Sequence, residues 1–404
     1  MLAIKEFKGP VKSWSVKISA SIIFLSIIIS ILGYLICVDK TPNANDGLVE
    51  IGKQLPGYSV KVLRIRKNYN QEGENFFKEI LNGQMSDYSV IPIKDVKIEG
   101  IKLTAEVVGK EDYFKEYNLL DVVFPVLKGP IQKGDEDFYI EKDGLYTFKT
   151  IDGEEVEMIH AEVIDILEKE NIVERSFILG TDRFGRDLYS RLVLGTRISV
   201  FIGFAAVIIS LFVGLLLGTL SGYYGGLIDN IVMWLMSVVW SVPGIMLVIA
   251  VSMVLGSKGI WVTFIAVGLT TWVEAARVIR GQVMTLKEMQ FIEAARAYGL
   301  RNFSIIFKHI IPNIYSSLIV VATAIYAVSI LLEAGLSFLG LSVQPPTPSW
   351  GNMVYEGYQV LGTKNSWHLI LFPGLAIIIM VLSFNLLGIG LQKATNPQKQ
   401  TSNI

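Results

Sequence analysis

Long uninterrupted runs of apolar residues, rather than alternating or amphipathic patterns, dominate this chain of 404 residues. A helix needs about 20 consecutive apolar residues to cross the core of a bilayer. Runs of that length lie at Ile18–Val38, Ile198–Leu220, Ile231–Leu255, Ile260–Val278, Ile314–Leu339 and Leu369–Leu391. The pattern therefore predicts an all-α polytopic membrane protein with six transmembrane helices.

The one long polar stretch, residues 40–178, lies between the first two apolar runs, and its patterns predict a small α+β domain. Residues alternate in strand fashion over Gly57–Arg66, and Val90–Val108 is interpreted as strands broken near Glu99-Gly100. Asp143-Gly144 stands between two alternating runs, which is a strong hairpin signal. At about 140 residues the stretch is long enough to bury a core of its own. Short helices are expected at Asn75–Leu81 and Ala161–Lys169.

The net charge of −1 at pH 7 hides a division of charge along the chain. About three quarters of the acidic residues fall between Asp39 and Arg175. Basic residues gather before the first apolar run, between Arg277 and Lys308, and after the last run. Cytoplasmic loops of membrane proteins carry an excess of lysine and arginine. With six crossings all three basic segments share one side, so both termini are expected in the cytoplasm and residues 40–178 outside it.

The sequence contains no pattern for several kinds of site. No G-x-x-x-x-G-K-[ST] motif occurs, so the chain has no P-loop to hold nucleotide phosphates. The three histidines are dispersed and Cys37 is the single cysteine, so no metal site and no intrachain disulfide are expected. Residues 40–178 show no convergent polar groups, and we interpret them as a rigid spacer or docking surface rather than a ligand-binding site. No catalytic or cofactor-binding residue is assigned, and no nucleic-acid partner is expected.

Residues Gln290–Asn313 form a charged, amphipathic segment between two apolar runs. Glu293-Ala294-Ala295 belongs to a short helix, Gly299 allows the positive φ that ends it, and Pro312 restarts a second helix. The pattern predicts two short helices that stand out of the membrane. The local alternative is an amphipathic helix that lies on the membrane surface.

A second charged stretch, Leu179–Leu192, precedes the second apolar run and reads L-G-T-D-R-F-G-R-D-L-Y-S-R-L. Charges of both signs alternate in it, while Leu188 and Leu192 fall on one side of a helix. The pattern predicts a helix that lies at the membrane surface before the second span.

Residues 179–397 resemble the second membrane subunit of dipeptide, oligopeptide and nickel ABC importers. Residues 179–192 are similar to the segment before the second span of these permeases, and residues 290–313 to their EAA coupling loop. The resemblance implies a type I ABC importer permease fold with an inserted extracytoplasmic α+β domain, where the family typically has a short loop. The expected organisation is a tail and first helix at 1–39, the inserted domain at 40–178, the permease domain at 179–397 and a cytoplasmic tail at 398–404.

The same resemblance implies ATP-driven import across the bacterial cytoplasmic (inner) membrane, with peptides or another small solute such as a nickel chelate as cargo. ATP would be bound and hydrolysed by partner subunits, so the chain itself would need no cofactor. The implied partners are a second homologous permease subunit, two ABC ATPase subunits and an extracytoplasmic substrate-binding protein. The residues expected to carry ATPase coupling are Glu293, Ala294, Ala295, Gly299 and Pro312.

Candidate pathway or gating residues are Glu333 and Pro243. A carboxylate inside a membrane segment is costly unless it faces a cavity or a partner, so each such residue is a functional candidate. Glu274 is followed by Arg277 and Arg280, and we expect an ordinary ion pair there. Glu333 has no nearby cation, so a pathway role and a buried hydrogen-bonded contact both stay open. Pro243 is expected to kink the third helix.

Two other classes of function stay open. An ion-driven secondary transporter could relay protons through Glu274 and Glu333, and it would need no ATPase. A sensor or scaffold could act through residues 40–178, with the helices as an anchor. Co-purification of an ATPase would distinguish the importer from both.

Overall fold

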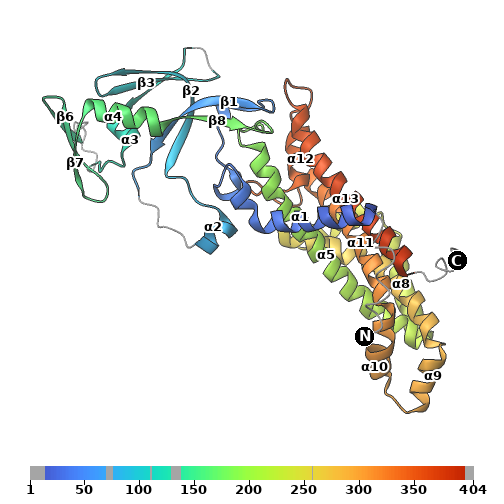
Figure 1. Cartoon of the computed structure of the whole chain (residues 1–404). Coiled ribbons are helices and arrows are strands. Elements are labelled where there is room, and N and C mark those ends of the chain that lie inside the picture. Colours follow the sequence, from blue (N-terminus) through green and yellow to red (C-terminus); the bar gives the residue numbers. More distant parts are fainter. Residues whose placement is uncertain (1–13, 70–75, 110–111, 129–137, 257, 396–404) are drawn as a thin grey trace. The chain divides into compact units, whose positions relative to one another are not determined.

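The computed structural model describes residues 14–69, 76–109, 112–128, 138–256 and 258–395, so the predicted tail at 398–404 lies outside the described residues. The chain divides into two compact units. One unit holds the chain up to Gly33, Leu192–Tyr358 and the chain from Ile370 onward, and its described part is helical. The other holds Tyr34–Arg191 and Gln359–Leu369 and contains every described strand (Figure 1). The fold class is therefore mostly helical, with an α+β unit in the N-terminal half of the sequence.

Five helices of the described chain are long and apolar enough to cross a membrane, and a bent pair makes a sixth candidate. The five are α1 (Trp14–Ile36), α5 (Leu188–Tyr224), α8 (Ile260–Lys287), the run Asn302–Phe338 with α10 (Asn302–Ile305) and α11 (Ile311–Phe338), and α13 (Trp367–Thr395). Each coincides with one of the predicted apolar runs.

The third predicted span, Ile231–Leu255, is not one straight helix. It consists of α6 (Gly226–Trp240) and α7 (Gly244–Val254), whose axes meet at 96°. Pro243 lies at the break, with φ −53° and ψ 130°. Proline has no backbone N–H to continue a helix and disfavours helical geometry in the residue before it. The kink predicted at Pro243 is therefore a sharp break.

Helices α5 and α8 run parallel and touch through glycines. A Cβ added at Gly218 would lie 2.5 Å from the Ala276 carbonyl oxygen, and one at Gly222 would lie 2.8 Å from the Arg280 carbonyl oxygen. Gly268, earlier on α8, meets Ile209, earlier on α5. Later residues of α5 thus contact later residues of α8, as expected for parallel helices. Small residues such as glycine allow helices of a membrane bundle to approach this closely.

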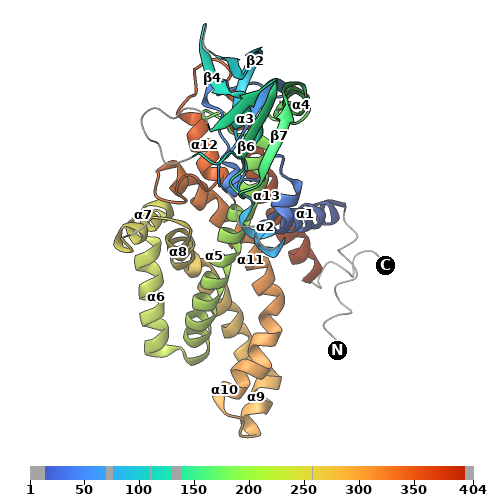
Figure 2. The same ribbon diagram turned by 90° about the vertical axis from the view of Figure 1, so that its left-hand side faces the viewer.

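The parallel arrangement of α5 and α8 requires the chain to return between them. Figure 2 shows α6 leaving the C-terminal end of α5 and running back toward the end at which α8 begins. The bent pair α6–α7 is therefore counted as one candidate crossing, which gives the described helices up to six candidate crossings by length and composition.

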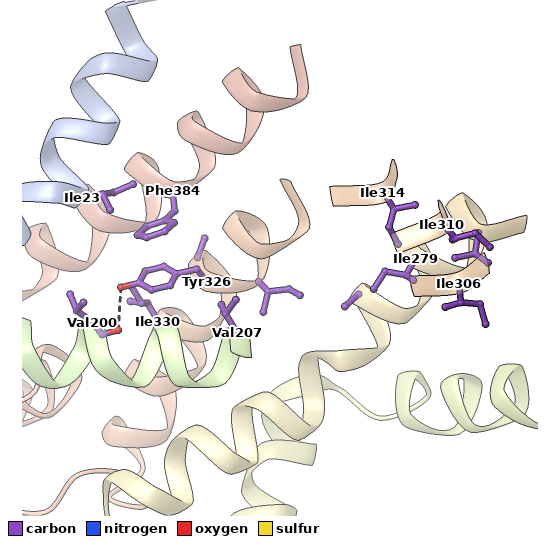
Figure 3. Close-up of a cluster of buried hydrophobic side chains, with 14 of the residues drawn as sticks. Ile23, Val200, Val207, Ile279, Ile306, Ile310, Ile314, Tyr326, Ile330 and Phe384 are labelled. Carbon is purple, nitrogen blue, oxygen red and sulfur yellow. Dashed lines mark hydrogen bonds between the residues drawn. The ribbon is translucent and has the colours of Figure 1, made fainter. Parts of the chain in front are cut away.

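The core of the helical unit is centred on Tyr326 of α11. Its ring stacks on Phe384 of α13 with a centroid distance of 3.6 Å, and its hydroxyl donates to the Val200 carbonyl oxygen of α5 at 3.5 Å (Figure 3). A Cβ at Gly203 would lie 2.8 Å from the same ring. One aromatic side chain thus joins three helices.

The α+β unit contains a five-stranded antiparallel sheet in the order β4-β3-β2-β1-β8 and a three-stranded sheet in the order β5-β6-β7. The strands are β1 (Tyr58–Arg66), β2 (Tyr88–Glu99), β3 (Lys102–Val107), β4 (Phe114–Asn118), β5 (Tyr139–Lys142), β6 (Leu145–Lys149), β7 (Glu155–Ile159) and β8 (Ile172–Phe177). The hairpin predicted at Asp143-Gly144 is confirmed, since both residues have positive φ, 53° and 77°, between paired strands β5 and β6.

Both faces of the five-stranded sheet are used. On one face Leu63 and Ile93 pack with residues of α3 (Leu119–Val123) and α4 (His160–Ile166). On the other face Val62 and its neighbours pack with Leu48 and Ile51 of the chain that follows α1. Helix α2 (Phe76–Asn82) also belongs to this unit and confirms the helix expected at Asn75–Leu81, of which Asn75 lies outside the described residues.

Candidate functional site

The connection between α8 and α11, residues Gln290–Asn313, is the candidate functional site. It consists of α9 (Gln290–Ala297), a tight turn, α10 and a π-helical turn at Ile306–Ile310 that leads into α11. Figure 1 shows α9 and α10 side by side at one end of the helical unit. The two short helices predicted from the sequence are therefore present.

Gly299 ends α9 in a complete Schellman motif. The Leu300 N–H donates to the Ala295 carbonyl oxygen at 3.2 Å, and the Gly299 N–H donates to the Arg296 carbonyl oxygen at 2.9 Å. Gly299 has φ 76°, and a Cβ there would meet no heavy atom within 4 Å. The position thus favours glycine for its backbone conformation alone, with no steric demand. The predicted glycine stop with positive φ is confirmed.

The inner face of the connection is anchored by apolar side chains. Ile292 and Ala295 of α9 are buried, as are Ile305, Ile306 and Ile310, in one cluster with residues of α8. Ala295 is small enough to let α9 sit close to this cluster, whereas Ala294 is exposed. The two alanines of the E-A-A stretch therefore have different surroundings.

The outer face of the connection is aromatic and charged. Tyr298, Phe303 and Phe307 expose 88%, 70% and 53% of their surface, and the rings of Phe303 and Phe307 lie 4.3 Å apart between centroids. Glu293 and Arg296 are exposed on α9. Exposed aromatic rings beside charged groups are typical of surfaces that contact another protein. Sequence reasoning missed the two phenylalanines, although their four-residue spacing on a polar helix could have revealed them.

A polar contact ties the connection to the end of α5. The Tyr223 hydroxyl donates to Oδ1 of Asn302 at 2.9 Å, and the Arg296 guanidinium lies 5.6 Å from the centre of the Tyr223 ring. Tyr223 thus contacts both short helices. The residues are too far apart in sequence for a local pattern to predict this contact. Pro312 lies in the first turn of α11, where a missing N–H is tolerated.

The ion pair expected for Glu274 is wrong. Arg280 instead donates from Nε and Nη2 to the two carboxylate oxygens of Asp229 on α6, both at 2.6 Å. Arg277 lies over the Trp240 ring at 3.6 Å. Glu274 is exposed on α8, and no cation of the described chain lies within ion-pair distance of it. The spacing in sequence failed because Asp229 and Trp240 come from another helix.

The two pathway candidates lie in different surroundings. Glu333 is 1% exposed, and its Oε1 accepts a hydrogen bond from the Ser337 hydroxyl at 2.8 Å, one turn along α11. Pro243 and the rest of the break between α6 and α7 are exposed. Glu333 is buried, and its Oε2 has no hydrogen-bond partner in the described part of the chain, so both alternatives for this residue stay open. Pro243 and Glu274 lie on the surface of the chain.

The helix predicted over Leu179–Leu192 is wrong for most of its length, since α5 begins at Leu188. Before it, the Asp182 carboxylate accepts hydrogen bonds from the Phe184 N–H at 2.8 Å and from Nε of Arg186 at 2.6 Å. Asp182 and Arg186 are both buried. A buried carboxylate that binds the backbone two residues on stabilises a turn rather than a surface helix. This charged motif therefore organises the chain ahead of α5.

Comparison with known proteins places these features in a family. A family described as "Binding-protein-dependent transport system inner membrane component" matches residues 214–400. The chain is 42% identical over 220 residues to the glutathione transport system permease protein GsiD of Pectobacterium atrosepticum. This alignment covers 54% of this chain and 72% of that protein. It is 40% identical over 219 residues to the oligopeptide transport system permease protein OppC of Bacillus subtilis, covering 54% of this chain and 71% of that one.

A solved inward-facing structure of the MetNI methionine ABC transporter aligns with a TM-score of 0.42 and 19% identity, over 52% of this chain and 98% of the other. The assignment depends on the permease relatives, because each is matched over more than two thirds of its length. The chain belongs to the family of binding-protein-dependent transport system inner membrane components.

Proposed function

We propose that the chain is one of two membrane-spanning permease subunits of an ATP-driven importer with a type I fold, and that residues 290–313 dock onto separate ATPase subunits. The outer face of the connection Gln290–Asn313 carries this proposal. Its exposed rings, Tyr298, Phe303 and Phe307, stand on a connection whose inner face is buried against α8. A rigid protrusion with an aromatic tip is suited to transmit movement from a partner into the bundle.

Within this segment the coupling residues have separate roles. Glu293 and Ala294 lie on the exposed side and would contact the ATPase, whereas Ala295 packs α9 against the bundle. Gly299 holds the turn between the two short helices, and Pro312 begins the long helix that receives the movement. The chain has no P-loop, so nucleotide would be bound and hydrolysed by two ATPase subunits.

A second permease subunit would cover the surface that carries Glu274 and the exposed break at Pro243. A carboxylate that faces lipid is costly, and irregular backbone at membrane depth is tolerated only beside protein or water. Both features therefore favour a neighbouring subunit and a pathway along this surface. Glu333 would not line this surface, because it is buried, and it would instead stabilise α11 through its hydrogen bond with Ser337.

Six crossings and the positive-inside rule support an orientation in the bacterial inner membrane with both termini and residues 290–313 in the cytoplasm. Residues 40–178 would then form a domain outside the membrane, where a substrate-binding protein would deliver cargo. Two of the relatives are named for glutathione and oligopeptide transport, and short peptides are the proposed cargo.

The test is purification from native membranes in mild detergent, followed by reconstitution in liposomes. We expect a second permease and two ATPases to co-purify. Uptake of a labelled dipeptide should require ATP hydrolysis, stop with vanadate and continue with a protonophore. Uptake that proceeds without nucleotide and stops with a protonophore would refute the proposal and favour the ion-driven alternative, in which the unpaired Glu274 would carry the proton.

A further inference from the structure

The α+β unit contains a cavity of about 460 Å³ against its five-stranded sheet. Strands β2, β1 and β8 lie side by side there (Figure 1), and Val62, Val90 and Val173 form an apolar floor. The chain after α1, from Val38 to Thr41, and the segment before β2, from Gln84 to Ser86, also line it. A volume of this size falls in the range of about 300–1,000 Å³ typical of small-molecule sites.

The acidic side chains of the cavity are already engaged. Asp39 is 4% exposed, and its Oδ1 accepts from the Thr41 N–H at 2.9 Å and from the Thr41 hydroxyl at 2.6 Å. Burial raises the pKa of the Asp39 carboxyl above its ordinary value. Asp46 accepts from Nη1 of Arg175 at 2.7 Å. Neither carboxylate is left to attract a cation.

Glu174 also lines the cavity, but its side chain belongs to the other face of the sheet. Glu174 of β8 lies directly opposite Lys61 of β1, and the preceding residue, Val173, lies directly opposite Val62. Successive side chains of a strand point to opposite faces, so Lys61 and Glu174 lie opposite the valine floor. Glu174 therefore does not balance the positive charge of the cavity.

Two cationic side chains of the cavity are not engaged. Arg64 lies on the same face of β1 as Val62, and Lys40 follows Asp39 in the chain segment at the rim. Both are exposed, and in the described part of the chain their side chains make no hydrogen bond or ion pair. The cavity thus offers unpaired positive charge beside an apolar floor.

We propose that this cavity binds a small carboxylate with an apolar side chain, such as an amino acid or the C-terminal end of a short peptide. Arg64 and Lys40 would pair with the carboxylate, and the three valines would receive the apolar group. The choice of a peptide as the source rests on the proposed function. The proposal revises the expectation that residues 40–178 serve only as a spacer or docking surface.

The test is isothermal titration calorimetry on the purified full-length chain in detergent, with the dipeptide valylvaline, its C-terminal amide and inorganic phosphate as probes. We expect the dipeptide to bind at least about tenfold more tightly than the amide, which lacks the carboxylate, and than phosphate, which cannot use the apolar floor. Arg64→Gln should weaken dipeptide binding by about tenfold or more, and Lys61→Gln, on the opposite face of β1, should leave it unchanged.

Lys40→Gln provides an independent loss of binding if the Arg64 variant does not accumulate. The proposal would be overturned if the dipeptide bound no more tightly than its amide, or no more tightly than phosphate. It would also be overturned if Arg64→Gln and Lys40→Gln both bound the dipeptide as tightly as the unchanged chain. The purified chain contains no ATPase, so the binding measurement and the uptake measurement fail independently of each other.

Discussion

Replacing Gly299 with valine tests whether the turn that ends α9 transmits movement. Gly299 has φ 76°, and left-handed backbone costs a residue with a Cβ about 1–2 kcal/mol. No heavy atom lies within 4 Å of a Cβ at this position, so the backbone supplies the whole energy. The equilibrium constant for the native turn should therefore fall by about 5- to 30-fold.

The assay is ATP-driven uptake of a labelled dipeptide by liposomes that contain the whole transporter, normalised to the amount of this chain. Gly299→Val should lower uptake in proportion to the loss of the native turn, while the amount of protein in the membrane stays the same. Gly299→Asn should retain more uptake, since asparagine tolerates this backbone better. Gly281→Ala is the matched control, because its α8 position has equally open space without positive φ. Uptake by Gly299→Val equal to that of Gly281→Ala would refute the reasoning.

Three further predictions follow from the contacts of the helical unit. Phe303→Ala should lower the yield of co-purified ATPase by about tenfold or more, because an aromatic anchor of the docking surface is lost. Phe212 of α5 is equally exposed but lies outside the connection, so Phe212→Ala should leave the yield unchanged. Equal yields of ATPase from the two variants would contradict the docking surface. Gly218→Leu should lower the thermal midpoint or prevent accumulation, because its Cβ would lie 2.5 Å from the Ala276 carbonyl oxygen. Arg280→Gln should lower the stability of the helical unit by about 1–3 kcal/mol in a thermal unfolding assay, because the Asp229 carboxylate loses its cation. Adding Asp229→Asn to the same chain should restore part of this stability. A double variant no more stable than Arg280→Gln alone would argue against the pair.

The long helices were predictable because a bilayer leaves a chain few alternatives. In hydrocarbon every backbone polar group must be bonded within the chain, so a run such as Ile260–Val278 can only be helical. The hairpin at Asp143-Gly144 was predictable for a local reason as well, since its two turn residues tolerate positive φ. The sharp break at Pro243 was only half predicted, because proline reveals a discontinuity but not its angle.

The wrong predictions share a physical cause, which is competition from residues distant in sequence or from the backbone. Glu274 was expected to pair with Arg277 or Arg280, but Arg277 lies over the Trp240 ring, and Asp229 from α6 accepts hydrogen bonds from Arg280 with both oxygens. The charges around Asp182 suggested a surface helix, yet its carboxylate binds backbone N–H groups and closes a turn. The cavity in the α+β unit escaped notice because its lining comes from four separate segments, and none of them carries a recognisable pattern.

The glycine contact between α5 and α8 has a mechanical consequence. At Gly218 and Gly222 the backbone of α5 lies against backbone carbonyl groups of α8 and against the β-branched side chains of Ile279 and Val283, so little space is left for one helix to move without the other. Helix α8 has 28 residues and extends about 42 Å. If an ATPase displaces α9 as proposed above, these contacts would make α5 move together with α8, so the displacement would reach the far end of both helices.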